Sequence, residues 1–225
     1  IFGAFLERTG IANFFIALAN RLAGWSAVGP AKVAVISSAL CGMVSGSSVG
    51  NTVTTGSVTI PMMKKTGYHP DFAGAVEAAA STGGQIMPPI MGAAAFLMAE
   101  YMDLPYATVA VKAILPAVLY FTGIFISVHL EAKKLGLKGL SKDEMPKWSF
   151  LLRKIYLLAP LVLLVWLVSS GAKTMQFSAA VSILAAVIVG FLNKDERLTF
   201  KKIFEALEAG AKGAITVGVS CAIAG

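Results

Sequence analysis

The sequence predicts an all-α membrane protein that crosses the bilayer several times. Hydrophobic residues make up 56% of the chain and charged residues only 14%, and the mean hydropathy is +0.75. A soluble domain needs more polar residues than this to cover its surface. Runs of about 20 apolar residues, the length that an α-helix needs to cross a bilayer, alternate with short polar stretches.

The elements expected from these runs follow one another along the chain. Residues 1–6 are expected to end a span, and residues 11–25 to form an amphipathic arm at the membrane interface. The longer apolar stretches are 31–63, 70–99, 106–130, 155–171, 175–192 and a last one from about 203. The stretches after 31–63 are expected to give five crossings of the bilayer.

Basic residues indicate how these spans are oriented. Lys and Arg are concentrated in residues 131–154 and 193–202. Because cytoplasmic loops carry the excess of basic residues, both connectors are expected to face the cytoplasm. The net charge of +7 is therefore interpreted as a topology signal, and no nucleic-acid partner is expected.

Residues 31–63 are unusual because basic residues flank both ends, Lys32 at the start and Lys64 and Lys65 at the finish. Both ends are therefore expected on the cytoplasmic side, so that the segment enters the membrane and turns back as a re-entrant hairpin. Its only polar turn is "SGSSVGN", residues 45–51. Non-helical backbone at membrane depth is tolerated only where it is buried in protein or lines a cavity, so these polar groups are expected to face a site.

The two half-helices of this hairpin bring opposite dipole ends to the turn. The first is expected to end near Ser45, where its carbonyl groups and the hydroxyls of Ser47 and Ser48 can ligate Na+. The second is expected to begin near Asn51, where free N–H groups favour an anion, typically a carboxylate. A cation and an anion can therefore bind side by side.

Residues 70–99 are expected to form a helix that is broken in the middle. Gly83-Gly84 and Pro88-Pro89 interrupt the pattern, because proline lacks an N–H group and restricts the residue before it. A simple proline kink is the alternative, but it does not explain the polar residues at the break. The groups expected to face the hairpin turn are Ser81, Thr82, Gly83, Gly84 and Gln85.

Glu77 is the acidic residue of this broken helix. Acids within spans are often functional, so Glu77 can relay protons or pair with a coupling ion. Its expected place near the cytoplasmic end favours an ordinary interfacial pairing instead.

Residues 45–100, which begin "SGSSVGNTVTTGSVTIP" and end "STGGQIMPPIMGAAAFLMAE", closely resemble the large membrane subunit of TRAP (tripartite ATP-independent periplasmic) transporters, above all the type with fused subunits. The resemblance covers essentially the whole chain and is most specific over 40–135. It implies an ion-transporter-superfamily elevator fold, present in part, and Na+-coupled import of an organic acid delivered by a periplasmic substrate-binding protein. It also implies the cytoplasmic (inner) membrane of a bacterium or archaeon.

The resemblance implies a site in which the hairpin tip meets the broken helix. The Na+ ligands expected there are Ser47, Ser48, Asn51, Gly83, Gly84 and Gln85. The substrate-binding residues expected there are Ser48, Asn51, Thr52, Thr82 and Gly83. No cofactor other than the coupling ion is expected.

The apolar runs and the change in composition divide the chain into four expected parts. These are a span end with an interfacial arm (1–28), part of the transport domain (29–130), a cytoplasmic connector (131–154) and further spans (155–225). The small-subunit portion and the second hairpin with its sodium site are not found in the sequence, so we expect the chain to be a fragment of the transporter.

Two other functions remain as alternatives to a transporter. A passive channel is one, because broken helices also line selectivity filters. The other is an intramembrane serine hydrolase, since "GSSVG" formally fits G-x-S-x-G with Ser48 as nucleophile and with Asp103 and His129 following. That pattern requires a strand-to-helix elbow, whereas the flanks here read as helical, so no enzymatic activity is expected.

Overall fold

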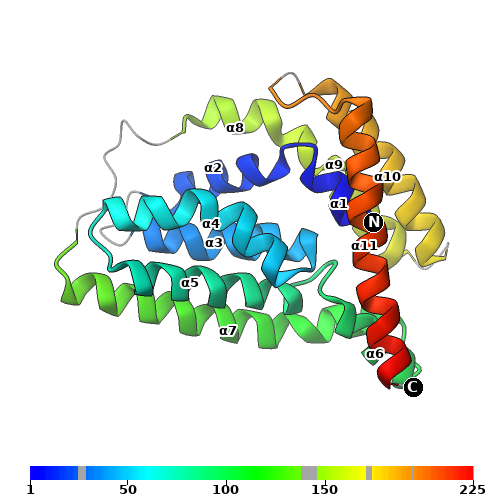
Figure 1. Cartoon of the computed structure of the whole chain (residues 1–225), viewed down its shortest axis with the longest axis horizontal. Coiled ribbons are helices and arrows are strands. Elements are labelled where there is room, and N and C mark those ends of the chain that lie inside the picture. Colours follow the sequence, from blue (N-terminus) through cyan, green and yellow to red (C-terminus); the bar gives the residue numbers. More distant parts are fainter. Residues whose placement is uncertain (25–28, 138–145, 171–173, 194, 225) are drawn as a thin grey trace.

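The computed structural model describes residues 1–24, 29–137, 146–170, 174–193 and 195–224. Every regular element within these ranges is a helix (Figure 1). The elements are α1 (Phe2–Glu7), α2 (Ile11–Ala23), α3 (Gly29–Ser45), α4 (Ser48–Lys65), α5 (Pro70–Gly83), the 3-10 turn η1 (Gly84–Ile86), α6 (Ala93–Tyr101), α7 (Tyr106–Lys134), α8 (Trp148–Lys154), the 3-10 turn η3 (Ile155–Leu158), α9 (Ala159–Ser169), α10 (Met175–Leu192) and α11 (Phe200–Ala224). The predicted all-α class is confirmed.

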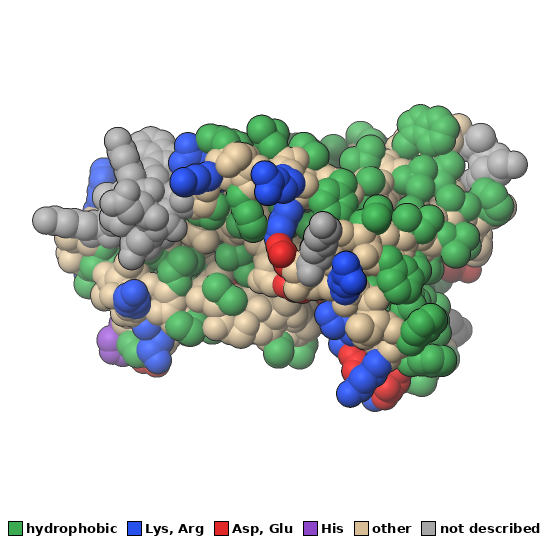
Figure 2. Space-filling view, turned by 90° about the horizontal axis from the view of Figure 1, so that it is seen from above, with side chains coloured by type: hydrophobic (Ala, Val, Ile, Leu, Met, Phe, Trp, Pro, Cys, Tyr) green, Lys and Arg blue, Asp and Glu red, His purple; other side chains and the backbone are tan. Residues whose placement is uncertain are grey.

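Three helical segments within the described ranges are long and apolar enough to cross a membrane. They are α7, the continuous stretch Trp148–Ser169 and α10. Large apolar side chains on these segments are exposed, and Figure 2 shows many hydrophobic side chains on the surface of one face of the molecule. A chain with these features is a multi-pass membrane protein. The two other expected crossings, the broken helix and α11, stay predictions.

Helices α3 and α4 form a hairpin that lies in the middle of a layered bundle (Figure 1). Helix α5 packs on both arms of the hairpin, α7 packs on α5 and α3, and α2 covers α3. The predicted helical hairpin is therefore present. The side of the membrane from which it enters stays a prediction.

Three apolar cores occur among the described residues, and the two larger ones hold most of the elements together. Near the ends of the hairpin, Ala34, Met63 and Val76 pack with Val128 of α7. At the other end of the molecule, Phe5 and other residues of α1 and α2 pack against α9 and α10. The first core fixes the hairpin against the broken helix, and thereby positions the polar residues described below.

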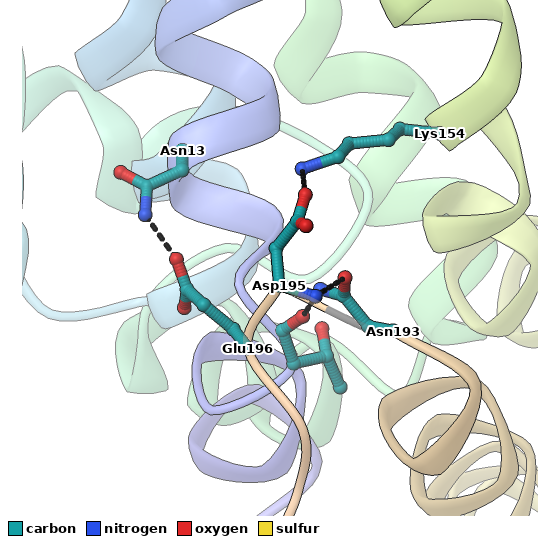
Figure 3. Close-up of polar contacts among 6 residues, drawn as sticks. Asn13, Lys154, Asn193, Asp195 and Glu196 are labelled. Carbon is teal, nitrogen blue, oxygen red and sulfur yellow. Dashed lines mark hydrogen bonds and ion pairs between the residues drawn. The ribbon is translucent and has the colours of Figure 1, made fainter.

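Residues 193, 195 and 196, which lie between α10 and α11, are attached to α8, α2 and the turn before α2 by polar contacts (Figure 3). Asn193 donates a hydrogen bond of 2.8 Å to a backbone carbonyl in the turn between α1 and α2. Lys154 forms an ion pair of 2.5 Å with Asp195, and Asn13 donates a hydrogen bond to Glu196. We call Asn13, Lys154, Asn193, Asp195 and Glu196 the ion-pair cluster.

Several predicted boundaries differ from the structure. The helix that leads into the expected span at 155 already begins at Trp148, because the apolar run "WSFLL" continues the helical pattern into the predicted connector. Helix α7 likewise extends to Lys134. Residues 138–145 of the predicted connector and residues 25–28 after the arm lie outside the described ranges.

Candidate functional site: the hairpin turn and the broken helix

The turn of the hairpin consists of only two residues, Gly46 and Ser47. Gly46 has a φ of +64°, the left-handed conformation that glycine adopts without steric cost and that commonly ends a helix. The Ser47 hydroxyl accepts a hydrogen bond of 3.2 Å from the N–H of Gly50 and so caps α4. The left-handed glycine that ends α3 and the serine that caps α4 allow the chain to reverse its direction within two residues. The predicted turn over 45–51 was therefore too long, and Asn51 lies in the first turn of α4 instead of at its start.

The break in the next segment occurs where the sequence predicted it. Helix α5 ends at Gly83, η1 follows, and residues 87–92 are not helical before α6 begins at Ala93. The consecutive prolines Pro88 and Pro89 lie in this gap, where neither can donate a backbone hydrogen bond. The structure therefore contains two shorter helices with an irregular connection, which is more than a proline kink.

The hairpin and the break touch through backbone atoms. A Cβ atom added to Gly84 would lie 2.5 Å from the Cα atom of Gly42, and one added to Gly46 would lie 2.5 Å from the carbonyl oxygen of Met91. No side chain fits at these glycines without displacement of backbone. The turn and the break therefore form one contact region, which we call the hairpin–break contact.

Asn51 is a predicted site residue that the fold buries almost completely, with 1% of its surface exposed. Its Nδ2 donates hydrogen bonds to the carbonyl oxygen of Ser38 (2.9 Å) and to the hydroxyl of Ser81 (3.1 Å). Its Oδ1 is buried and has no hydrogen-bond partner within the described part of the chain. A buried amide oxygen without a donor is an available ligand for a cation or for the hydrogen of a bound molecule.

The remaining predicted residues divide into two groups. Gly84 faces α3 at the hairpin–break contact, and Ser47 and Ser48 are at the turn. The other predicted residues, Thr52, Thr82, Gly83 and Gln85, point elsewhere. Gly83 packs on the ring of Tyr120 in α7.

Thr82 and Gln85 were expected to face the hairpin, and this expectation was wrong. Both side chains are exposed, and the Thr82 hydroxyl donates to the carbonyl oxygen of Ala78 within its own helix. They are three residues apart, so they share one face of the helical turn, and Ser81 and Gly84 occupy the face toward the hairpin. The hydroxyl of Thr52 is likewise occupied within α4, by the carbonyl oxygen of Ser48.

The sequence interpretation missed a polar cluster around Glu77. This side chain is fully buried, and four hydroxyl groups from three helices surround its carboxyl group. Interfacial pairing was expected for Glu77, and this was wrong, since no ion pair of Glu77 occurs among the described residues. We call Ser38, Thr55, Thr59, Glu77 and Ser81 the hydroxyl cluster.

The sequence does contain a signal for this cluster. Asn51, Thr55 and Thr59 recur every fourth residue in α4, and Glu77 and Ser81 have the same spacing in α5. Residues four apart lie on one face of a helix, so each helix carries a polar stripe. Two polar stripes in neighbouring apolar helices predict a buried polar interface, which a search for single acidic residues does not detect.

Comparison with known proteins identifies the family. The sequence model of the tripartite ATP-independent periplasmic transporter, DctM component, matches residues 1–225. The chain belongs to this family.

Curated DctM relatives are similar over most of the chain. A C4-dicarboxylate TRAP transporter large permease protein of Pseudomonas aeruginosa is 26% identical over 88% of this chain and 46% of its own length. A sialic acid TRAP transporter large permease protein of Vibrio cholerae is 25% identical over 84% of this chain and 44% of its own length. The chain thus spans less than half the length of these DctM relatives.

The DctM fold also bears on the hydrolase alternative. Ser48 follows a helix-to-helix turn, whereas the G-x-S-x-G pattern acts at a strand-to-helix elbow. No hydrogen bond joins Ser48 to Asp103 or His129 among the described residues. The serine hydrolase therefore has no structural support at this turn.

Proposed function

We propose that this chain supplies the first hairpin and the broken helix of an inner-membrane permease that imports an organic acid together with Na+. Asn51 carries the proposal, because its buried Oδ1 lacks a donor at the hairpin–break contact. Leaving a buried acceptor unpaired costs about 1–3 kcal/mol, so a bound cation that uses this oxygen gains stability. Oxygen atoms are the ligands that hard cations prefer.

The substrate is proposed to be a carboxylate. Helix α4 begins with Ser48 at the turn, where first-turn N–H groups and the positive end of the helix dipole favour an anion. The named substrates of two relatives, C4-dicarboxylates and sialic acid, are carboxylic acids. A periplasmic substrate-binding protein is the proposed donor of this acid, in keeping with the family description.

Alternating access is proposed to follow an elevator mechanism. The hairpin, the broken helix and α7 pack into one bundle, and such a unit can move as a body between the two sides of the membrane. Since the chain covers 46% of one relative's length, a second hairpin elsewhere in the whole transporter is proposed to complete the site.

Uptake into proteoliposomes by the full-length transporter with its binding protein tests this function. Asn51→Ala is expected to raise the Na+ concentration for half-maximal uptake about tenfold, the effect of losing roughly 1.4 kcal/mol of binding. Thr54→Ala is the matched control, because Thr54 belongs to the same helix but is exposed, and its hydroxyl donates to the carbonyl oxygen of Gly50 within α4. An unchanged Na+ dependence in Asn51→Ala removes this side chain from the site. Flux that is only downhill favours the passive channel.

A further inference from the structure

We propose that Glu77 binds a proton inside the hairpin bundle, and that this proton is exchanged when a cation binds at Asn51. The first half concerns Glu77 alone, and the second rests on the proposed function. The comparison with related transporters assigns no role to Glu77, and the proposed Na+ site does not include this residue. Its surroundings argue for the proposal in three steps.

The first step concerns what fits around the carboxyl group. Oε1 accepts hydrogen bonds from the hydroxyls of Ser38 (2.5 Å), Thr55 and Ser81 (3.2 Å). Oε2 accepts a hydrogen bond from Thr59. Oxygen atoms at these separations are joined by hydrogen bonds and leave no space for a metal ion between them. A proton is the cation that this cluster can hold.

The second step concerns the two states of the cluster. A hydroxyl group both donates and accepts, unlike an ammonium or guanidinium group. The Thr55 hydroxyl lies 2.7 Å from the carbonyl oxygen of Asn51, and the Thr59 hydroxyl lies 3.0 Å from that of Thr55. When Glu77 is ionised, both hydroxyls donate to it. When Glu77 is protonated, its O–H donates to the Thr59 hydroxyl, which turns its own hydrogen to the helix carbonyl. Both states are satisfied without movement of heavy atoms.

The other titratable groups around Glu77 form no ion pair with its carboxyl group among the described residues. On α3, α4 and α5 these groups are Lys32, Cys41, Lys64, Lys65 and Asp71, and on α7 they are Tyr106, Lys112, Tyr120, His129, Glu131, Lys133 and Lys134. The Cys41 thiol is near enough to interact electrostatically with Glu77, but it is a hydrogen-bonding partner in none of the described contacts. Lys32 lies over the ring of Phe125, and none of these groups forms an ion pair with Glu77 in the described part of the chain.

The third step connects Glu77 to Asn51. The Ser81 hydroxyl accepts a hydrogen bond from Asn51 Nδ2 and donates one to Glu77. Ser38 makes a second connection, since its carbonyl oxygen accepts from Asn51 and its hydroxyl donates to Glu77. A cation at Asn51 Oδ1 would therefore lie close to the carboxyl group and favour its ionised form. By linkage, cation binding releases the proton and acidification weakens cation binding.

Proton release from the purified full-length transporter tests the exchange. Na+ is added in weakly buffered solution with a pH indicator, choline chloride serves as the ionic control, and calorimetry measures Na+ binding. The native protein is expected to release a proton on Na+ binding, and Glu77→Gln to bind Na+ without release. Glu100→Gln, which removes an exposed carboxyl group of α6, is expected to behave like the native protein. Equal release from the native protein and Glu77→Gln, or Na+ binding by the native protein without release, overturns the exchange.

Infrared spectroscopy tests proton binding by Glu77 separately from sodium coupling. A protonated carboxyl band that appears with falling pH and is lost in Glu77→Gln supports the proton site, even where calorimetry shows no Na+ binding and the proposed function fails. Absence of that band from the native protein overturns the site. If Glu77→Gln does not fold, Thr59→Val is used, because it keeps the carboxyl group and removes one hydroxyl. It is expected to move the pH midpoint of the band, and an unmoved midpoint overturns the proposal.

Discussion

The hydroxyl cluster joins three consecutive helices, the ion-pair cluster joins segments that are distant in sequence, and the two clusters use opposite means. In the hydroxyl cluster, one fully buried carboxyl group is surrounded by four hydroxyls, and no cation pairs with it among the described residues. In the ion-pair cluster, Lys154, whose side chain is 18% exposed, faces Asp195, whose side chain is 63% exposed and therefore open to water (Figure 3). The first cluster lies between the hairpin and the broken helix, and the second ties the loop before α11 to α2 and α8.

This difference in exposure determines how much each contact contributes to the free energy of unfolding. Water replaces a lost partner at an exposed ion pair, so such pairs contribute about 0–1 kcal/mol. Water does not reach the buried carboxyl group, so a lost partner there leaves polar groups unpaired. The partners of the carboxyl groups differ as well. A hydroxyl can hydrogen-bond to a carboxyl group in either protonation state of that group, whereas a lysine pairs only with the ionised form. The buried cluster is therefore suited to a change of charge, and the exposed one to a fixed attachment.

Removal of the two central carboxyl groups gives the largest expected contrast. Glu77→Ala removes the acceptor that four hydroxyls share and leaves a cavity at a fully buried position, and is expected to cost about 2–4 kcal/mol of stability. Glu196→Ala removes one half-buried partner of the exposed Asn13 and is expected to cost less than about 1 kcal/mol. Thermal unfolding of the full-length protein in detergent measures both. Equal shifts of the unfolding temperature would contradict the contrast between the clusters.

A glycine pair tests the backbone contact that brings the hydroxyl cluster together. Gly84→Ala places a Cβ atom 2.5 Å from the Cα atom of Gly42, and we expect it to cost about 1–3 kcal/mol by overpacking. The matched control is Gly74→Ala in α5, where a Cβ atom meets nothing within 4 Å. Since alanine favours a helix by up to about 1 kcal/mol over glycine, the control is expected to be neutral or more stable. A similar loss of thermal stability in both variants would show that the close contact is unimportant.

The sequence predicted the hairpin and the break because both depend on local rules. Glycine followed by serine at 46 and 47 ends one helix and caps the next, and the prolines at 88 and 89 prevent a helix from continuing. The orientation of Thr82 and Gln85 could not be predicted in this way. Their direction depends on which face of α5 packs against the hairpin, and that is decided by contacts between helices.

The burial of Glu77 could not be predicted from local rules either. Hydropathy alone favours the interface for an acidic residue, and the partners that permit its burial come from two other helices, at Ser38, Thr55 and Thr59. The ion-pair cluster was not predicted either. Asn13 and Glu196 are 183 positions apart, and nothing in either neighbourhood indicates the other.

The smallest expected effect is the coupling between Lys154 and Asp195. Lys154 also lies 4.5 Å from the centre of the Phe150 ring, so Lys154→Ala alone removes more than the ion pair. A double-mutant cycle with Asp195→Ala isolates the pair, and we expect a coupling energy of at most about 1 kcal/mol at low salt. In about 1 M salt the screening length falls to roughly 3 Å, so this coupling is expected to approach zero. The corresponding cycle between Glu77→Gln and Thr59→Val is expected to keep its coupling energy, because salt ions do not reach a fully buried carboxyl group. Measured by thermal unfolding at both salt concentrations, salt sensitivity in the buried pair would mean that the hydroxyl cluster is open to solvent in the membrane protein.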